Sequence, residues 1–449
     1  MINLFEEYNT EAMDLEYSLK SSGLNAQTIV LKDNGYLPEE IESPFKFFTQ
    51  GAASSKQHLP LFFNELELPV HWEVHGTNSG AEIFEGYKQR GKINYSQRKG
   101  DFRLIQSVEW WNDQEKRRAV DLYNQYGQRF GHQTYSDGRL TLTTYYDREG
   151  REVVLHNHVA GTLQVYYQNQ LYIFDNYSSF VLFYFEVAQL DTRRIHYNSL
   201  GTPYFITLDL AKAHPEISYA HTLFWQETST AMPGNMKGLM QKGDQASTRQ
   251  IIVQNKAEFE RLRAQVDFAT SVSMDYLGWL YPYRAHEAFK PSVFVLTNSD
   301  QVAHLHTLSE GLPEYQFHIA ARTEMSSKLM NFGARPNVNL YPNVTTEELD
   351  GLLQSCSVYL DINHGGEVEQ IIRQSFEHEQ VIMAFRETLH NPRFVSPSFV
   401  FESQDVEVML ESLRDLLDSK AKFKQKLKAQ KEHAGQESIS RYKKVLEHA

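Results

Sequence analysis

The residues best suited to chemistry lie between Val358 and Phe385, where a glycine pair, four glutamates and an arginine separate two apolar segments. The apolar segments predict buried strands, and the residues between them predict a glycine turn followed by a helix. The N–H groups at the start of such a helix, after Gly365 and Gly366, could hold a phosphate group. A plain strand-to-helix turn explains a lone glycine pair at least as well.

This segment resembles the donor-binding core of GT-B glycosyltransferases, in which a Glu-x7-Glu pair spans the turn and the helix N-terminus. Counted back from the strand that begins at Val381, the two glutamate positions fall on Gly365 and Arg373. Glu367 and Glu369 lie nearby but are only two residues apart, so they do not reproduce the spacing. The resemblance therefore implies a kept scaffold that has lost its catalytic carboxylates.

A second departure from the same resemblance lies after the first strand of the C-terminal domain. Active members place an arginine and a lysine there to neutralise the donor's diphosphate. This chain has Thr297-Asn298-Ser299-Asp300-Gln301, which offers no cation and one carboxylate, with Asn298 and Asp300 as the degenerate positions. A leaving UDP is poorly stabilised without local cations. We expect no catalytic residue and no cofactor, although an inward Arg373 could still meet a phosphate.

Two further groups are candidates for binding rather than catalysis. Tyr145, Tyr166 and Tyr172 are part of a tyrosine-rich face that suits an extended, polar polypeptide, because tyrosine combines area with a hydroxyl group. The alternative is cross-strand pairing that stabilises the sheet. His221 is predicted to end a buried strand, where it either touches an acceptor or merely lines a cleft.

A histidine pair, His156 and His158, is the one metal-like motif. The two rings share a face if the segment is a strand, but no cysteine or carboxylate cluster follows at metal-ligand spacing. We therefore expect surface histidines and no metal site.

The surrounding elements predict an α/β chain with an all-β insertion. Residues 66–186 alternate apolar and polar between turn signals, which predicts an antiparallel meander of roughly six to nine strands. Elsewhere strands alternate with helices, which is typical of parallel, doubly wound sheets. The expected domains are a split Rossmann-like domain (1–65 and 187–285), the inserted sheet (66–186), a second Rossmann-like domain (286–404) and C-terminal helices that cross back to the first domain (405–449). Three strands of the split domain are predicted at Pro203–Leu208, Ile217–Thr222 and Arg249–Gln254.

Composition narrows the class of protein further. The net charge of −13 and the absence of a strong basic stretch outside the C-terminal tail argue against a nucleic-acid partner. The single cysteine, Cys356, rules out an internal disulfide framework and suits a reducing compartment. The acidic N-terminal segment has no long apolar run and predicts no signal peptide. We expect a cytoplasmic chain, with peripheral contact to the inner face of the membrane left open.

The whole arrangement resembles the paired GT-B proteins of Gram-positive accessory secretion systems, which attach N-acetylglucosamine to serine-rich repeat adhesins. The opening residues, the insertion and the degenerate site are similar to the stabilising subunit of that pair. The resemblance implies two partners: a homologous catalytic O-GlcNAc transferase and the serine-rich repeat adhesin polypeptide. The rival interpretation is an active retaining GT-B glycosyltransferase with an unusual donor site, similar to teichoic-acid glucosyltransferases that share the inserted β region.

Overall fold

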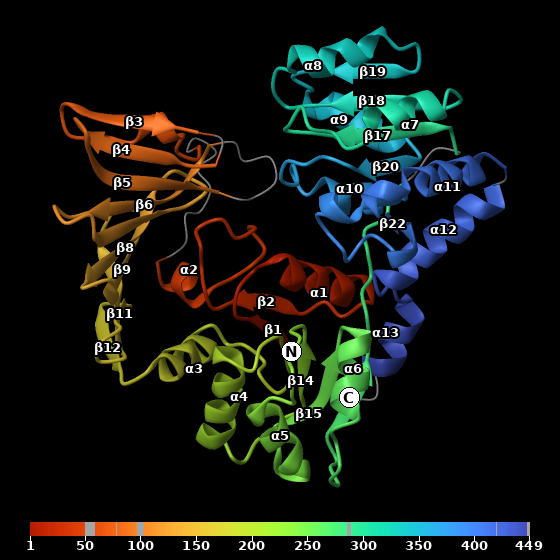
Figure 1. The fold of residues 1–449 in the computed structure, drawn as a ribbon. Coiled ribbons are helices and arrows are strands. Elements are labelled where there is room, and N and C mark those ends of the chain that lie inside the picture. The colour runs from red at the N-terminus through yellow and green to blue at the C-terminus, as the bar shows by residue number, and fades with distance from the viewer. Residues whose placement is uncertain (50–58, 78, 97–102, 285–288, 419, 447–449) are drawn as a thin grey trace. The chain divides into compact units, whose positions relative to one another are not determined.

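The structure is a computed structural model that describes residues 1–49, 59–77, 79–96, 103–284, 289–418 and 420–446 (Figure 1). The chain divides into two compact units. Unit 1 contains Met1–Leu277 and Ser440–Ala449, and unit 2 contains Gly278–Ile439. None of the described helices is both long and apolar enough to cross a membrane.

A six-stranded parallel sheet forms the first half of unit 1, with strands in the order β16-β15-β14-β13-β1-β2. Four of its six strands are followed directly by a polar residue, namely Glu6, Asn198, Gln226 and Gln254. The strands are β1 (Ile2–Phe5), β2 (Gln27–Val30), β13 (Ile195–Tyr197), β14 (His221–Trp225), β15 (Thr248–Val253) and β16 (Ser273–Tyr276). The order reverses direction between β1 and β13, which makes that position the topological switch point of the sheet.

Helices accompany this sheet, and several of them begin at a capping side chain. The Asn9 side chain accepts a hydrogen bond from the Ala12 N–H at 2.9 Å and begins α1. The terminal helix α13 returns to unit 1, where the Val445 carbonyl accepts a hydrogen bond from Gln250 at 3.1 Å. The helices are α1 (Thr10–Ser21), α2 (Pro44–Phe48), α3 (Tyr177–Val187), α4 (Thr202–Ala213), α5 (Gly234–Gln241), α6 (Lys256–Arg263) and α13 (Ile439–Leu446).

Two strand predictions in this sheet were wrong. The strand expected at Pro203–Leu208 lies inside α4, because its apolar run PYFITL buries one helical face and leaves Phe205 49% exposed. A short apolar run fits either periodicity, so the sequence pattern alone does not separate the two. The strand expected at Ile217–Thr222 begins only at His221.

A ten-stranded antiparallel sheet forms the rest of unit 1 and is a plain meander from β3 to β12. The prediction of roughly six to nine strands was therefore too low. Strands such as β5 (KQRGKINY) and β7 (RRAVDLY) carry many charges, which hides their alternation. The strands are β3 (Trp72–Gly76), β4 (Ala81–Glu85), β5 (Lys88–Tyr95), β6 (Ile105–Trp111), β7 (Arg117–Tyr123), β8 (Arg129–Ser136), β9 (Arg139–Tyr146), β10 (Glu152–Asn157), β11 (Thr162–Tyr167) and β12 (Gln170–Phe174).

The last four strands of the meander have two different faces. Tyr145, Val154, Val165 and Tyr172 lie in one cross-strand row, and this inner face packs against α2 and α3. The opposite, outer face carries Tyr166 and its neighbours. Because successive residues of a strand alternate between faces, this division decides which tyrosines are accessible.

Unit 2 holds a second six-stranded parallel sheet with the order β19-β18-β17-β20-β21-β22. Its α9 begins with a capping box in which Thr345 and Glu348 bind each other's main-chain N–H groups. The elements are β17 (Ser292–Leu296), α7 (Leu305–Gly311), β18 (Gln316–Ala320), α8 (Ser327–Met330), β19 (Val338–Tyr341), α9 (Thr346–Ser355), β20 (Val358–Asp361), α10 (Ile371–Glu377), β21 (Val381–Phe385), β22 (Val400–Phe401), α11 (Val406–Asp418) and α12 (Lys420–His433). Two Rossmann-like sheets and an inserted antiparallel sheet confirm the predicted fold class.

Candidate functional site

The predicted donor site lies at the carboxyl ends of β17 and β20, where asparagine side chains fill the space beside Gly365. Asn363 is 2% exposed. It donates to the Asn298 side chain at 3.0 Å and accepts from the Thr297 hydroxyl at 2.8 Å and the Gly365 N–H at 3.0 Å. These bonds satisfy the buried amide and fix the turn, so the site is internally bonded.

Gly365 tolerates no larger residue in this arrangement. A Cβ at this position would lie 1.8 Å from Asn298 Oδ1, well inside the closest approach of two such atoms. The glycine has no left-handed φ, so the conflict comes from the neighbouring side chain and not from the backbone. A glutamate at position 365 is therefore incompatible with the present position of Asn298.

A second set of bonds closes the same turn from the opposite side. The His390 ring lies between the Asp361 carboxylate and the Gly365 carbonyl and hydrogen-bonds both. The His390 N–H also donates to Asp361 at 2.8 Å. The bond to Asp361 raises the pKa of His390, because the nearby carboxylate favours the charged imidazolium. Asp361 is 1% exposed, so this pair is structural and offers no open position for a ligand.

The cations near the site are already paired with carboxylates. Arg373 lies in α10 and donates to Glu377 at 2.8 Å. Arg322 makes two bonds to Glu369 at 2.7 and 2.8 Å. Asp300 accepts from Ser326 at a long 3.4 Å. Because Arg322 and Arg373 already pair with carboxylates of the protein, they attract a diphosphate less strongly than unpaired arginines would.

The glycine pair does not begin a helix. The α10 helix starts at Ile371, after Glu369 and Gln370 adopt left-handed conformations with φ of 51° and 53°. Four residues separate Gly366 from the helix, which agrees with the plain strand-to-helix turn considered from the sequence and not with a phosphate-binding helix N-terminus at the glycine pair. The phosphate site considered from the sequence therefore lacks the helix N-terminus that would supply its N–H groups.

The three tyrosines named from the sequence differ in exposure: Tyr145 is buried, Tyr172 is half-buried and Tyr166 is exposed. Tyr166 is 52% exposed on the outer face of the meander. Tyr145 is 9% exposed and stacks on Phe45 with ring centroids 4.1 Å apart, and burial raises its pKa. Tyr172 packs on Phe183 of α3 at 4.5 Å. The prediction of a binding role for Tyr145 was wrong, because its ring is buried in the core, whereas the binding roles of Tyr172 and Tyr166 stay predictions.

His221 also lies away from any binding edge. It begins β14 instead of ending it, is completely buried, and its Nδ1 accepts the Ile195 N–H at 3.1 Å. Burial lowers the pKa of His221 to about 3, so the ring is neutral. The prediction that His221 reaches an acceptor was wrong. The strand starts four residues later than expected, so His221 is its first residue and not one of its last.

A polar hollow that the sequence analysis missed lies at the opposite, carboxyl edge of the same sheet, at its switch point. It has a volume of about 350 Å3. Glu6 follows β1, Asn198 follows β13 and Gln226 follows β14, and hydrogen bonds join all three. The full lining is Glu6, Glu7, Asn9, Glu11, Lys32, Asn198, Ser199, Gln226 and Glu227. The polar residues that directly follow β1, β13 and β14 were the sequence signal that could have found it.

The charges of this hollow exclude a phosphate ligand. Its one cation, Lys32, already pairs with Glu6 at 3.3 Å and Glu7 at 2.7 Å. The remaining side chains mostly accept hydrogen bonds, which suits hydroxyl and amide donors. Ligands of open α/β sheets bind outside the carboxyl ends of the strands at a switch point. The hollow is therefore a candidate site for an uncharged, donor-rich ligand.

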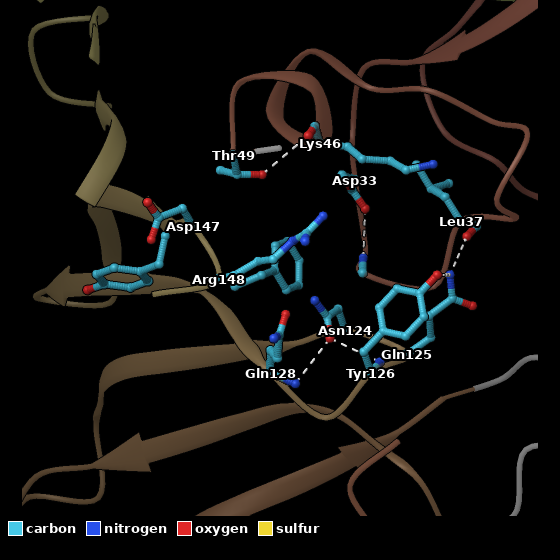
Figure 2. A pocket seen from close by; sticks show the side chains of 13 residues that line it. Asp33, Leu37, Lys46, Thr49, Asn124, Gln125, Tyr126, Gln128, Asp147 and Arg148 are labelled. Carbon is cyan, nitrogen blue, oxygen red and sulfur yellow. Dashed lines mark hydrogen bonds between the residues drawn. The ribbon is translucent and has the colours of Figure 1, made fainter. Parts of the chain in front are cut away.

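A second hollow lies between the loop after β2 and the turns of the meander, and Figure 2 shows its lining residues. Asp33 accepts bonds from the Gly35 N–H at 2.8 Å and the Ser43 hydroxyl at 2.9 Å. Asn124 accepts from the Tyr126 N–H at 3.0 Å. The volume of about 50 Å3 is far below the roughly 300 Å3 of the smallest usual ligand pockets. This hollow is therefore part of the packing contact between the inserted sheet and the first sheet.

The histidine pair stacks and does not form a metal site. The His156 and His158 rings lie 3.8 Å apart, and the Thr143 hydroxyl bonds His158 at 2.8 Å. Burial lowers the pKa of His156 to about 4. Among the residues described, no three His, Cys, Asp or Glu side chains converge in a way that could hold a metal ion.

Four family models match successive parts of the chain. They are the GtfB N-terminal domain over residues 2–48, the GtfB middle domain over 72–175, the GtfB third domain over 178–264 and the GftB/GlyA-F C-terminal domain over 293–430. The middle-domain match covers the inserted sheet, so the insertion is shared with these proteins.

Whole-chain relatives agree with these models. The UDP-N-acetylglucosamine–peptide N-acetylglucosaminyltransferase stabilizing protein GtfB of Streptococcus agalactiae is 37% identical over 99% of both chains. The protein of the same name from Limosilactobacillus reuteri is 32% identical, again over 99% of both chains. A chain in the crystal structure of a GtfA/B complex bound to UDP and GlcNAc is 32% identical, with a TM-score of 0.92 over 100% of this chain and 99% of that one.

These similarities extend over the full length and include the region of the closed donor site. Relatives of at least this identity and coverage establish a family and not only a fold. The chain belongs to the GtfB family of peptide N-acetylglucosaminyltransferase stabilizing proteins.

Proposed function

We propose that the chain is the non-catalytic subunit of a UDP-GlcNAc:peptide N-acetylglucosaminyltransferase complex. It stabilises a homologous catalytic transferase and presents a serine-rich repeat adhesin polypeptide to that partner. The relatives are named as stabilising proteins of the transferase, and one solved relative comes from a GtfA/B complex. The chain itself performs no sugar transfer.

The observation that carries the proposal is the closed turn around Gly365. Loss of one carboxylate could be compensated by a neighbour. Here the space for its Cβ is occupied by Asn298, and the adjacent cation Arg373 is paired with Glu377. An active transferase with an unusual donor site needs an open position for the sugar nucleotide, and these contacts leave none beside Gly365. The rival interpretation therefore has no support from this site.

The acceptor polypeptide is proposed to bind at the polar hollow beside Glu6. A serine-rich chain offers hydroxyl and main-chain N–H donors, and Glu6, Asn198 and Gln226 offer fixed acceptors. Ser199 donates to Glu6 at 2.8 Å, and Gln226 donates to Gln254 at 2.8 Å, so the side chains are held in place before any ligand arrives. Binding next to a partner's active site raises the effective concentration of acceptor there.

The cytoplasm is the proposed compartment. The single cysteine, Cys356, is buried, and burial raises the pKa of its thiol to about 12. Such a thiol is unreactive, and a chain without disulfides suits a reducing compartment. Peripheral contact with the inner face of the membrane stays a prediction.

Acceptor binding by the isolated chain tests the presenting role. We expect a labelled serine-rich peptide to bind the purified chain, measured by fluorescence anisotropy, and to bind more weakly when Asn198→Ala removes one acceptor from the hollow. Glu186→Gln, an exposed glutamate on α3, is the matched control. Peptide that does not bind the wild-type chain at all would contradict the presenting role, whereas equal binding by Asn198→Ala would move the site elsewhere.

A further inference from the structure

The free edge of the inserted sheet lacks the protection that edge strands normally carry. The β12 strand is the last strand of the ten-stranded sheet, and within the described residues nothing pairs with its outer side. The β11–β12 hairpin, Thr162–Phe174, contains no charged residue and no proline. Exposed edges usually hold charges that block the addition of another strand. The other edge of the same sheet follows that rule, because β3 carries the exposed Glu73.

The turn of this hairpin decides which main-chain groups face the open side. Gln168 and Asn169 both have positive φ, 49° and 61°, as a two-residue hairpin turn of type I′ requires. Tyr167 and Gln170 close that turn as a hydrogen-bonded pair. Bonded and non-bonded pairs alternate along an antiparallel ladder. The N–H and C=O groups of Leu171 and Ile173 therefore point away from β11, toward the open edge.

The side chains at the same two positions are apolar and exposed. Leu171 is 53% exposed and Ile173 is 63% exposed. They pair across the ladder with Tyr166, which is 52% exposed, and with Gln164. A hairpin that combines unpaired main-chain groups with accessible apolar side chains presents both parts of a strand-docking site.

We propose that β12 docks an extended strand of the catalytic homologue, which adds to the sheet through the main-chain groups of Leu171 and Ile173. This rests on the proposed function and names the surface that it uses. A serine-rich polypeptide would leave the apolar side chains uncovered, whereas a folded partner can cover them. A second copy of this chain brings the same net charge of −13, which opposes self-association. The solved relative from a two-component complex also favours a heterologous occupant.

Two variants separate the docking edge from the fold. Ile173→Pro removes an outward N–H without removing a bond to β11, a position at which edge strands accept proline. Leu171→Lys combined with Ile173→Lys adds the charges that natural edges use. Tyr87→Lys is the control, because Tyr87 is fully exposed at another hairpin of the same sheet.

The affinity of each purified variant for the purified catalytic homologue is measured by biolayer interferometry, with thermal melting beside it. We expect both edge variants to bind at least about tenfold more weakly at an unchanged melting temperature, and Tyr87→Lys to bind normally. Unchanged affinity in both edge variants overturns the proposal. So does a wild-type homodimer in sedimentation that the edge variants abolish, or a loss confined to binding of a serine-rich peptide. A wild-type chain that neither binds nor activates the homologue would instead refute the proposed function itself.

Discussion

Replacing Gly365 by alanine should destabilise unit 2, although the residue lies in a turn where alanine is usually harmless. The added Cβ would stand 1.8 Å from Asn298 Oδ1 and push that side chain aside. Asn363, which is 2% exposed, then loses its 3.0 Å bond to Asn298. A hydrogen bond between buried groups contributes about 1 kcal/mol, and a displaced neighbour adds strain of similar size. We expect a loss of about 1–3 kcal/mol.

Two companion variants isolate that cause. Gly366→Ala is the matched control, because a Cβ there meets nothing within 4 Å and its φ is not left-handed, so its effect should stay within about 0.5 kcal/mol. Asn298→Ala removes the obstacle, so Gly365→Ala should cost little more in that background.

Urea unfolding of the full chain gives the free energies, and hydrogen exchange of the segment 358–385 assigns the change to unit 2. Equal midpoints for the wild type, Gly365→Ala and Gly366→Ala would refute the reasoning. A full loss that persists without Asn298 would show that another contact is responsible.

Three further outcomes are expected. Burial lowers the pKa of His196 to about 4 and of His221 to about 3, so the unfolded chain takes up protons below about pH 6.5 while the folded chain does not. Stability should therefore fall by about 1.4 kcal/mol per histidine for each pH unit between about 6.5 and 4, and urea midpoints that are equal at pH 7 and pH 5 would contradict this. Tyr145→Ala should cost about 3–5 kcal/mol because it empties the space beside Phe45, while Tyr166→Ala should leave the melting temperature unchanged; similar melting of the two variants would argue against the assigned faces. Asn198→Asp should weaken binding of a serine-rich peptide, because a carboxylate cannot make the 3.2 Å bond that the Asn198 amide donates to Gln226 and that holds this side chain in place, and an unchanged dissociation constant would exclude the hollow as the acceptor site.

Much of the fold was predictable because buried parallel strands are continuous apolar runs. The strand at Val381–Phe385 coincides with its predicted bounds. Pro203–Leu208 failed because an apolar run of that length also fits one face of a helix. The weak strands of the meander failed for the opposite reason, since their charges mask the period of two.

The site was only partly predictable. The resemblance predicts missing glutamates at Gly365 and Arg373, but the contact of Gly365 with Asn298 depends on an approach between two segments more than sixty residues apart. The expected position of His221 was sensitive to the bounds of the strand. An error of four residues in the start of β14 placed His221 at the wrong end of that strand. Tyr145 and Tyr166 lie on opposite faces of the same sheet. The packing of α2 and α3 against one face decides that Tyr145 is buried, and the sequence pattern does not show this packing.

The rate at which the catalytic homologue transfers GlcNAc to a serine-rich acceptor is the most direct test of the central claim. It should be measured with the homologue alone, with this chain alone and with both, by release of UDP and by the mass of the acceptor. We expect no transfer by this chain alone and faster, longer-lasting transfer by the two together than by the homologue alone. Transfer by this chain alone, or an equal rate and lifetime of the homologue without it, would contradict the account.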